Sequence, residues 1–210
     1  MENITKQKII DSAITLFNTK GYSGTSVREI SKMAKTNVSN ISYYFMNKAG
    51  LQEYLITSFF DDYLNILEEG YRQLKTMAPK ECIVMTVKLL MQYHKEHRHL
   101  ARFVYREITL DTVLVREVMS TYLTKEKYYW KAFLEEGKRR KELQAISIPM
   151  TIVHLKSMIS MPFLQAQYLA EVWHYMPYEP NAMEQYNKMI IEWLEQSVFA
   201  SPSYHQPLAL

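Results

Sequence analysis

The sequence predicts an all-α protein with a small N-terminal helix-turn-helix unit and a larger helical body. Three observations carry this prediction. Apolar residues recur every three or four positions along most of the 210 residues, as on the buried face of a helix. No segment shows the sustained alternation of a half-buried strand. All seven prolines lie at or beyond Pro79, so only glycines and capping residues divide the first 78 residues.

Apolar spacing and helix-breaking residues divide the chain into nine expected helices. Gly21 and Gly24 end the first of them. We expect a first domain at residues 1–47, an all-α body at 48–200, and a frayed tail at 201–210, where Pro202 and Pro207 lie. The expected helices cover residues 4–20, 26–33, 37–44, 48–75, 80–96, 98–108, 112–140, 149–173 and 181–199.

Composition limits the class of protein. Hydrophobic residues make up 48% of the chain and charged residues 22%, which is ordinary for a globular protein and excludes global disorder. The one cysteine, Cys82, excludes a disulfide framework within the chain and favours a cytoplasmic location. No apolar run has the length of a signal peptide or a membrane span, so we expect no membrane partner.

The sequence carries no motif of a catalytic site. A nucleophile elbow, a phosphate loop and a dinucleotide fingerprint are all missing. His94, His97 and His99 could bring two imidazoles to one helical turn, but two ligands without a nearby cysteine or matched carboxylate do not make a zinc site. A solvated helix end is the better interpretation, so we expect no enzyme, no metal and no cofactor.

Charge is concentrated at the N-terminus. Residues 1–50 hold seven Lys or Arg against three acidic residues, whereas the rest of the chain holds 18 against 19. A compact basic unit on a neutral body is typical of a protein that binds a polyanion. A chance excess on a solvated surface is the competing interpretation.

Two short helices, separated by a turn at Lys35 and Thr36, follow the first helix. Ser26 and Glu29 have the spacing of a capping box, which starts the second helix, and Asn37 is a good N-cap for the third. The apolar side chains that we expect to face inward are Val27, Ile30, Ala34, Ile41 and Phe45.

Small and polar side chains at the start of the third helix suit close approach to a DNA groove. Arg28 can contact a guanine edge, Asn40 can pair with adenine, and Val38 can contact a thymine methyl group. Tyr43, Tyr44 and Lys48 suit phosphates, which position a helix without specifying sequence. For Tyr44, packing in the core is an equally good interpretation.

These residues belong to a longer pattern: Ile9-Ile-x-x-Ala13-x-x-Leu16-Phe17-x-x-x-Gly21-Tyr-x-x-Thr25-Ser-Val-x-x-Ile30-x-x-x-Ala34, then Tyr44-Phe-x-x-Lys48-x-x-Leu51. The pattern resembles the DNA-binding domain of the TetR family of bacterial regulators. The resemblance implies a three-helix head, a long fourth helix that leads into an all-α body, and a homodimer formed through the last two long helices. It implies DNA contacts by Thr25, Ser26, Arg28, Asn37, Val38, Ser39, Asn40, Ser42, Tyr43, Tyr44 and Lys48.

Two positions depart from the family pattern. Lys35 stands where the family usually has glycine in the turn, and Ser42 stands where it usually has tyrosine. These departures bear on individual phosphate contacts and leave the mode of binding unchanged.

The body carries a narrower resemblance, in the runs Arg102-Phe-Val-Tyr-Arg-Glu-Ile-Thr-Leu-Asp111 and Met119-Ser-Thr-Tyr-Leu-Thr-Lys-Glu-Lys-Tyr128. Together with Ile41-Ser-Tyr-Tyr-Phe45, these runs resemble the RefZ group of TetR-like regulators from endospore-forming bacteria. That resemblance implies a nucleoid-associated homodimer that binds palindromic motifs in double-stranded DNA near the chromosome origin. It also implies inhibition of FtsZ-ring assembly during sporulation.

A surface for a protein partner such as FtsZ would need charged side chains that face outward. Arg98, Arg102 and Arg106 lie on one helical face, although an ordinary solvated face is the plain interpretation. Glu107 points with the apolar residues, so we expect it to pair with an arginine or to lie past the helix end, with Asp111 capping the next helix. The candidate partner contacts are Arg102, Arg106, Glu107, Arg116 and Glu117.

A ligand-responsive TetR-type repressor is the alternative function, and it would need a pocket in the body. An apolar stripe of this kind is more often plain core. The residues that could line a pocket are Met91, Trp130, Met158, Met161, Phe163 and Trp173.

The last two long helices hold more apolar residues than a two-helix hairpin can cover, which predicts a four-helix bundle with a second copy. We expect Met158, Pro162, Ile190 and Leu194 in that interface, with Pro162 kinking its helix.

Overall fold

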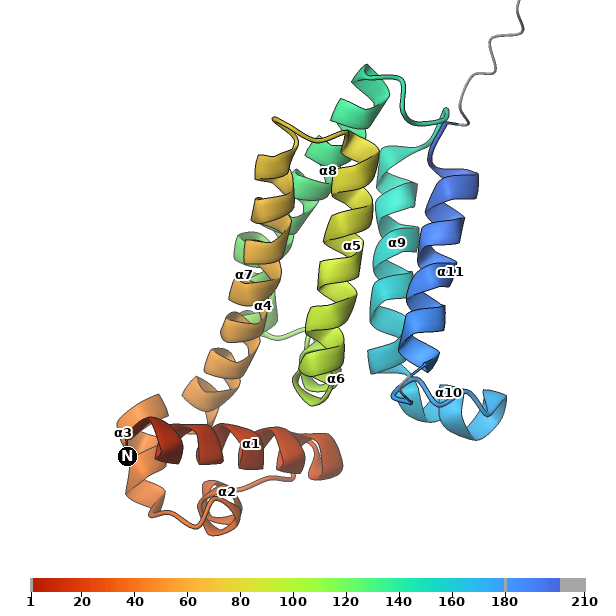
Figure 1. The fold of residues 1–210 in the computed structure, drawn as a ribbon. Helices are drawn as coiled ribbons and strands as arrows, with labels where there is room; N and C mark the ends of the chain where they lie inside the picture. Colours follow the sequence, from red (N-terminus) through yellow and green to blue (C-terminus); the bar gives the residue numbers. More distant parts are fainter. Residues whose placement is uncertain (1, 180, 201–210) are drawn as a thin grey trace, which may run out of the picture.

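The computed structural model describes residues 2–179 and 181–200, and the all-α prediction is confirmed (Figure 1). Within these ranges the one β-type pairing is an isolated antiparallel bridge between Leu143 and Phe199. The predicted frayed tail lies outside the described residues. The helices are α1 (Glu2–Lys20), α2 (Val27–Met33), α3 (Val38–Phe45), α4 (Lys48–Gln73), α5 (Pro79–Glu96), α6 (Arg98–Glu107), α7 (Val113–Val118), the π-helical turn η1 (Met119–Leu123), α8 (Thr124–Arg139), α9 (Ile148–Leu164), α10 (Ala166–Trp173) and α11 (Ala182–Ser197).

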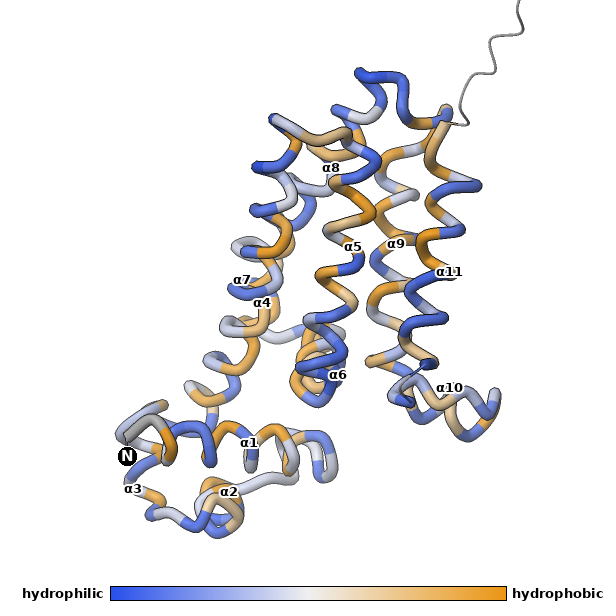
Figure 2. The backbone as a smooth tube through the Cα atoms, viewed as in Figure 1, coloured by the Kyte–Doolittle hydropathy of each residue, from blue (hydrophilic) through white to orange (hydrophobic). Residues whose placement is uncertain are grey.

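The first three helices form a head at one end of the molecule, and α4 runs from this head into the body (Figure 1). In the body, α4 packs on α5 and α8, while α9 packs on α6 and α8 and α11 covers α5. Apolar residues follow the inner sides of these helices (Figure 2). A core of large buried side chains, among them Phe59, Phe103 and Trp130, therefore holds the body together.

The helix expected at 112–140 starts with a different cap and contains one wide turn. The Thr112 hydroxyl, and not the Asp111 carboxylate, accepts the capping hydrogen bond, from the Val115 N–H at 3.2 Å. Asp111 is instead paired with Arg116 at 2.9 Å. Between α7 and α8, the Thr124 N–H donates to the Met119 carbonyl, five residues earlier, which defines the π-helical turn.

The prediction of one helix at 149–173 is wrong, because the helix ends at Leu164 and α10 begins at Ala166. Pro162 has no N–H to donate to the carbonyl of Met158, four residues earlier. The Tyr186 hydroxyl from α11 donates to that carbonyl at 2.9 Å. Gln165, with φ −114° and ψ 28°, then leaves the helical conformation, so the helix ends three residues after the proline.

His94 lies in the core of the body, so the expected solvated helix end is wrong for this residue. Its Nδ1–H donates to the Leu90 carbonyl at 2.6 Å, which leaves Nε2 to accept from the Tyr105 hydroxyl, also at 2.6 Å. Burial lowers the pKa of His94 to about 4, so the imidazole is neutral near pH 7. This neutral bridge ties α5 to α6.

An ion pair between the buried Glu126 and the half-buried Lys156 joins α8 to α9. The Glu126 carboxylate binds the Lys156 ammonium group and accepts a hydrogen bond from the Tyr63 hydroxyl at 2.6 Å. Since a buried carboxylate is stable only with such partners, this contact fixes the relative positions of α4, α8 and α9.

Candidate nucleic-acid interface

The start of α2 is fixed by the capping box that the sequence predicts. The Glu29 N–H donates to the Ser26 hydroxyl at 3.2 Å, and the Ser26 N–H donates to the Glu29 carboxylate at 2.8 Å. Hydrogen bonds from Lys20 and from Ser26 lower the pKa of Glu29 to about 2. The carboxylate therefore stays charged, and the N-terminal turn of α2 keeps a defined position.

Two residues implied as DNA contacts are used inside the head. Thr25 is buried, and its hydroxyl donates to the Gly21 carbonyl at 2.8 Å. Lys48 is half-buried, with its ammonium group donating to the carbonyls of Tyr22 at 3.0 Å and of Thr25 at 2.9 Å. It also lies 4.3 Å from the centre of the Tyr22 ring. Both residues therefore hold the loop before α2 to the start of α4.

Helix α3 is anchored by its inward side chains. Ile41 and Phe45 are buried, as predicted, and the Asn37 side chain accepts from the Ser39 N–H at 3.0 Å, which confirms the N-cap. Because α3 has only eight residues, it depends on this burial and capping for its stability.

The outer side of α3 is a polar and weakly apolar surface. Val38 is 36% exposed and Tyr43 is 70% exposed, and Ser39 and Ser42 are also exposed. Asn40 is half-buried and donates one amide N–H to the Thr36 hydroxyl at 2.5 Å. This bond orients the Asn40 amide and leaves its carbonyl oxygen and second N–H to meet a base. Tyr44 is half-buried, with its ring 6.1 Å from that of Phe45.

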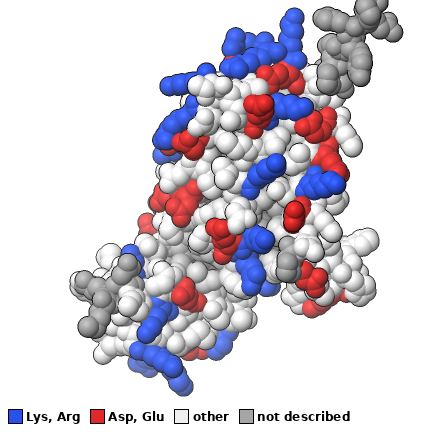
Figure 3. Space-filling view, viewed as in Figure 1, with Lys and Arg blue, Asp and Glu red and all other residues white. Residues whose placement is uncertain are grey.

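Cations surround this surface. Arg28 is exposed on α2, and its guanidinium group forms no ion pair or hydrogen bond with any residue in the described ranges, while its backbone carbonyl accepts from the Ser31 hydroxyl at 3.0 Å. Lys32 and Lys35 are exposed beside it, and Lys and Arg side chains gather at this end of the head (Figure 3). Neither lysine is among the DNA contacts predicted from the sequence, although both contribute to the basic charge of residues 1–50. We define the reading surface as the exposed side of α3 together with these three cations.

The turn between α2 and α3 requires a left-handed residue. Lys35 has φ +51°, a conformation that costs an L-residue about 1–2 kcal/mol and a glycine almost nothing. This explains in physical terms why glycine suits this position. In this protein Lys35 adopts the strained backbone conformation and also adds a positive charge next to α3.

Helix α6 holds the head against the body. The rings of Phe17 and Phe103 stack at 5.1 Å, and the Asn18 amide donates to the His99 carbonyl at 2.8 Å. Arg106 donates to the Asn18 carbonyl at 3.4 Å, and the Gln52 amide donates to Glu107 at 2.6 Å.

This joint changes the interpretation of two predicted partner contacts. Glu107 is the last residue of α6 and pairs with Gln52 rather than with an arginine; burial raises the pKa of its carboxyl group. Arg106 lies at the head as well. Arg116 and Glu117 are exposed on α7, and Arg102 is half-buried. The predicted partner contacts therefore do not form one patch.

The predicted dimer residues lie mostly inside the protomer. Ile190 and Leu194 are fully buried in the core of their own chain, and Pro162 is buried as well. Their placement in an interface with a second copy is therefore wrong. Met158 is half-buried.

The sides of α9 and α11 that face away from the core carry a set of uncharged side chains that are exposed or half-exposed; on α11 they lie beside the exposed Lys188 and Glu192. We call this set the outer face. It consists of Met150, Val153, His154, Ser157 and Met161 on α9 and Gln185, Met189, Trp193 and Gln196 on α11.

The residues proposed for an interior ligand pocket do not come together. Met91, Trp130 and Phe163 are buried in the packed core, whereas Trp173 is 66% exposed on α10. In the described part of the chain, no helix has the length and apolar character needed to cross a bilayer.

Comparison with known proteins agrees with the head geometry. Residues 9–55 match the family described as "Bacterial regulatory proteins, tetR family". The chain is 46% identical over 199 residues to the probable HTH-type transcriptional regulator YttP of Bacillus subtilis, covering 95% of this chain and 96% of that protein. It is also 43% identical over 60 residues to IcaR of Staphylococcus aureus, a negative regulator of the biofilm operon icaADBC; this match covers 29% of the chain.

Solved structures share the fold. The hemolysin II transcriptional regulator HlyIIR matches with a TM-score of 0.65 and 22% identity, over 91% of this chain and 97% of that one. The ketosteroid regulator KstR2 of Mycobacterium tuberculosis matches with a TM-score of 0.73 and 14% identity, over 93% and 95% of the two chains.

The left-handed Lys35 gives a test with two readouts. Replacing Lys35 by glycine should raise the free energy of unfolding by up to about 1 kcal/mol, because the relief of backbone strain exceeds the added entropy of the unfolded chain. The same change should lower the slope of log affinity for DNA against log salt by about one unit per head. Urea unfolding and salt titrations measure the two effects.

The matched control is Lys32→Ala, which removes an exposed charge from the same helix-turn region without changing a left-handed residue. It should lower the salt slope alone. A Lys35→Gly protein that is less stable than the wild type would contradict this account of the turn.

Proposed function

Because this chain belongs to the TetR family of bacterial transcriptional regulators, we propose that it binds palindromic sites in double-stranded DNA as a homodimer. One observation carries the proposal. Ile41 and Phe45 bury one side of helix α3 in the core of the head. The other side presents an uncharged first turn, capped by Asn37, and the exposed Arg28 has no partner for its guanidinium group within the described residues. Side chains at the start of a helix that enters the major groove are the ones that reach base edges.

A homodimer is supported by the outer face of α9 and α11. Met189 and Val153 are large apolar side chains of this face, and each is more than half exposed, which favours contact with a partner. Ser157 is small enough for close approach of a second helix. Two copies joined here would form a four-helix bundle and place two heads on one duplex.

The narrower proposal concerns the output. By resemblance to the RefZ group, we propose that the DNA-bound dimer acts at the nucleoid in the cytoplasm and inhibits FtsZ-ring assembly, which couples chromosome position to division during sporulation. Arg106 and Glu107 take part in the contact between the head and the body. Of the predicted partner contacts, Arg116 and Glu117 are the two that are exposed on α7 and lie outside that contact.

A ligand-responsive repressor is the second candidate function. One observation favours it, which is a pocket between α8 and α9. None of the residues that the sequence suggested for a ligand pocket lines it.

Arg28 tests the reading of DNA. Arg28→Ala should weaken binding to a selected palindrome by about 1–3 kcal/mol and relax the preference at one base position of each half-site. Fluorescence anisotropy on the palindrome and its single-base variants measures both. Lys32→Ala, as the control, should weaken all duplexes alike. Equal binding of the wild type to palindromic and scrambled duplexes would contradict sequence-specific reading.

The outer face tests dimerisation. A Ser157→Asp, Met189→Asp protein should sediment as a monomer, because the interface would have to bury carboxylates that have no positively charged partner. Its helical circular dichroism spectrum should be unchanged, and its operator binding should be much weaker. Leu89→Asp, at an exposed apolar position on α5, should stay dimeric. If the double variant also stays dimeric, the interface lies elsewhere.

Arg116 tests the output. Arg116→Glu should abolish inhibition of FtsZ polymerisation, measured by light scattering, and should leave DNA affinity unchanged and stability within about 0.5 kcal/mol. Lys188→Glu, a charge reversal at an exposed site on α11, should inhibit like the wild type. Full inhibition by Arg116→Glu would exclude this surface. A wild type without effect on FtsZ, with or without DNA, would exclude the division role and leave DNA binding intact.

A further inference from the structure

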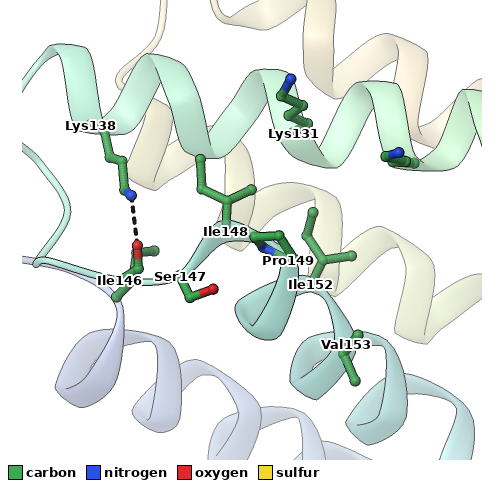
Figure 4. A pocket seen from close by; sticks show the side chains of 9 residues that line it. Lys131, Lys138, Ile146, Ser147, Ile148, Pro149, Ile152 and Val153 are labelled. Carbon is green, nitrogen blue, oxygen red and sulfur yellow. Dashed lines mark hydrogen bonds between the residues drawn. The ribbon is translucent and has the colours of Figure 1, made fainter.

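We propose that the pocket between α8 and the start of α9 binds a single-chain amphiphile with an anionic head, as in a free long-chain carboxylate. The pocket has a volume of about 660 Å³, within the usual range for small-molecule sites. It is formed by one side of α8, the loop that follows, and the first two turns of α9 (Figure 4). Of the functions proposed above, only the ligand-responsive repressor would use this pocket, so the inference rests on that candidate and names its class of ligand; Val153 is shared with the outer face.

The floor of the pocket suits a hydrocarbon chain. It is built from the side chains of the loop and of α9, which Figure 4 shows side by side along the cavity. Such a surface gains free energy when it is covered by apolar groups. The apolar lining residues are Ile146, Ile148, Pro149, Ile152 and Val153.

The rim suits an anion. Lys127, Lys131 and Lys138 lie on one side of α8, at spacings of four and seven residues, and all three line the pocket, whereas no carboxylate does. Lys138 donates to the Ile146 carbonyl at 2.6 Å, which holds its ammonium group at the cavity. Lys131 has only a long, exposed ion pair with Glu135, at 3.4 Å. The rim therefore keeps its positive charge.

The first turn of α9 adds hydrogen-bond donors. Ser147, the N-cap residue, lines the pocket, and its side chain makes no capping hydrogen bond. Pro149 in this turn has no N–H and the Thr151 N–H donates to the Ser147 carbonyl, so the Ser147 hydroxyl and the N–H of Ile148 are the donors that this end of α9 adds to the lysines.

A small amphiphile fits this pocket better than a second copy of the chain does. A two-fold contact centred here would bring the lysines of one copy against those of the other, which is repulsive. An anion with an apolar tail satisfies both the rim and the floor.

The experiment measures binding of monomeric laurate, below its micelle concentration, to the full chain by isothermal titration calorimetry. We expect saturable binding with one site per chain. A Lys127→Gln, Lys131→Gln protein should bind about tenfold more weakly, because each exposed ion pair contributes about threefold to fivefold. Lys125→Gln, on the opposite side of α8, is the matched control and should bind like the wild type. Dodecyltrimethylammonium, which has the same chain and the opposite charge, should bind much more weakly than laurate.

Three results would overturn the proposal: no saturable binding of laurate, equal affinity of the double lysine variant and the wild type, or equal affinity for the cationic amphiphile. Binding to phosphatidylglycerol vesicles without binding of monomeric laurate would also overturn it, since it would identify a membrane surface as the ligand. DNA anisotropy of the same variants is read separately, so failure of this site is distinguishable from failure of DNA binding.

Discussion

The packing of α1 against α6 is the contact on which the DNA-reading geometry depends. Helix α4 is the one covalent link that carries the head into the body, and a single helix could not by itself fix the orientation of the head. The stacked rings of Phe17 and Phe103 and the hydrogen bond from Asn18 to the His99 carbonyl close a second connection. In the proposed dimer, only heads held in this way could meet major grooves about 34 Å apart along one face of the duplex.

Local rules are what made much of the head predictable. The capping box at Ser26 and Glu29, the N-cap at Asn37 and the inward positions of Ile41 and Phe45 each depend on residues a few positions apart. The roles of Lys48 could not be read in this way, because its ammonium group binds carbonyls 23 and 26 residues earlier in the chain. A lysine near DNA and a lysine that ties two loops together look alike in a sequence.

The same limit applied in the body. Apolar spacing correctly indicated that Ile190 and Leu194 are buried, but it could not show whether a second copy or the protomer itself buries them. The Met158 carbonyl, which Pro162 leaves without a donor from its own helix, accepts instead from Tyr186, 28 residues away in the chain. His94 and Glu126 are buried for a related reason, since their polar partners come from other helices. The spacing of apolar residues shows which side of a helix is buried. Which helix or chain covers that side depends on the whole fold.

In the proposed dimer, two copies of this head are held at a fixed separation and bind one palindrome. Selection of bound duplexes from a random-sequence pool by the purified full chain tests this claim most directly. We expect enrichment of a single two-fold symmetric motif whose half-sites are centred about one helical turn, or a whole multiple of it, apart. Enrichment of an asymmetric single half-site, or no enrichment above the starting pool, would contradict it.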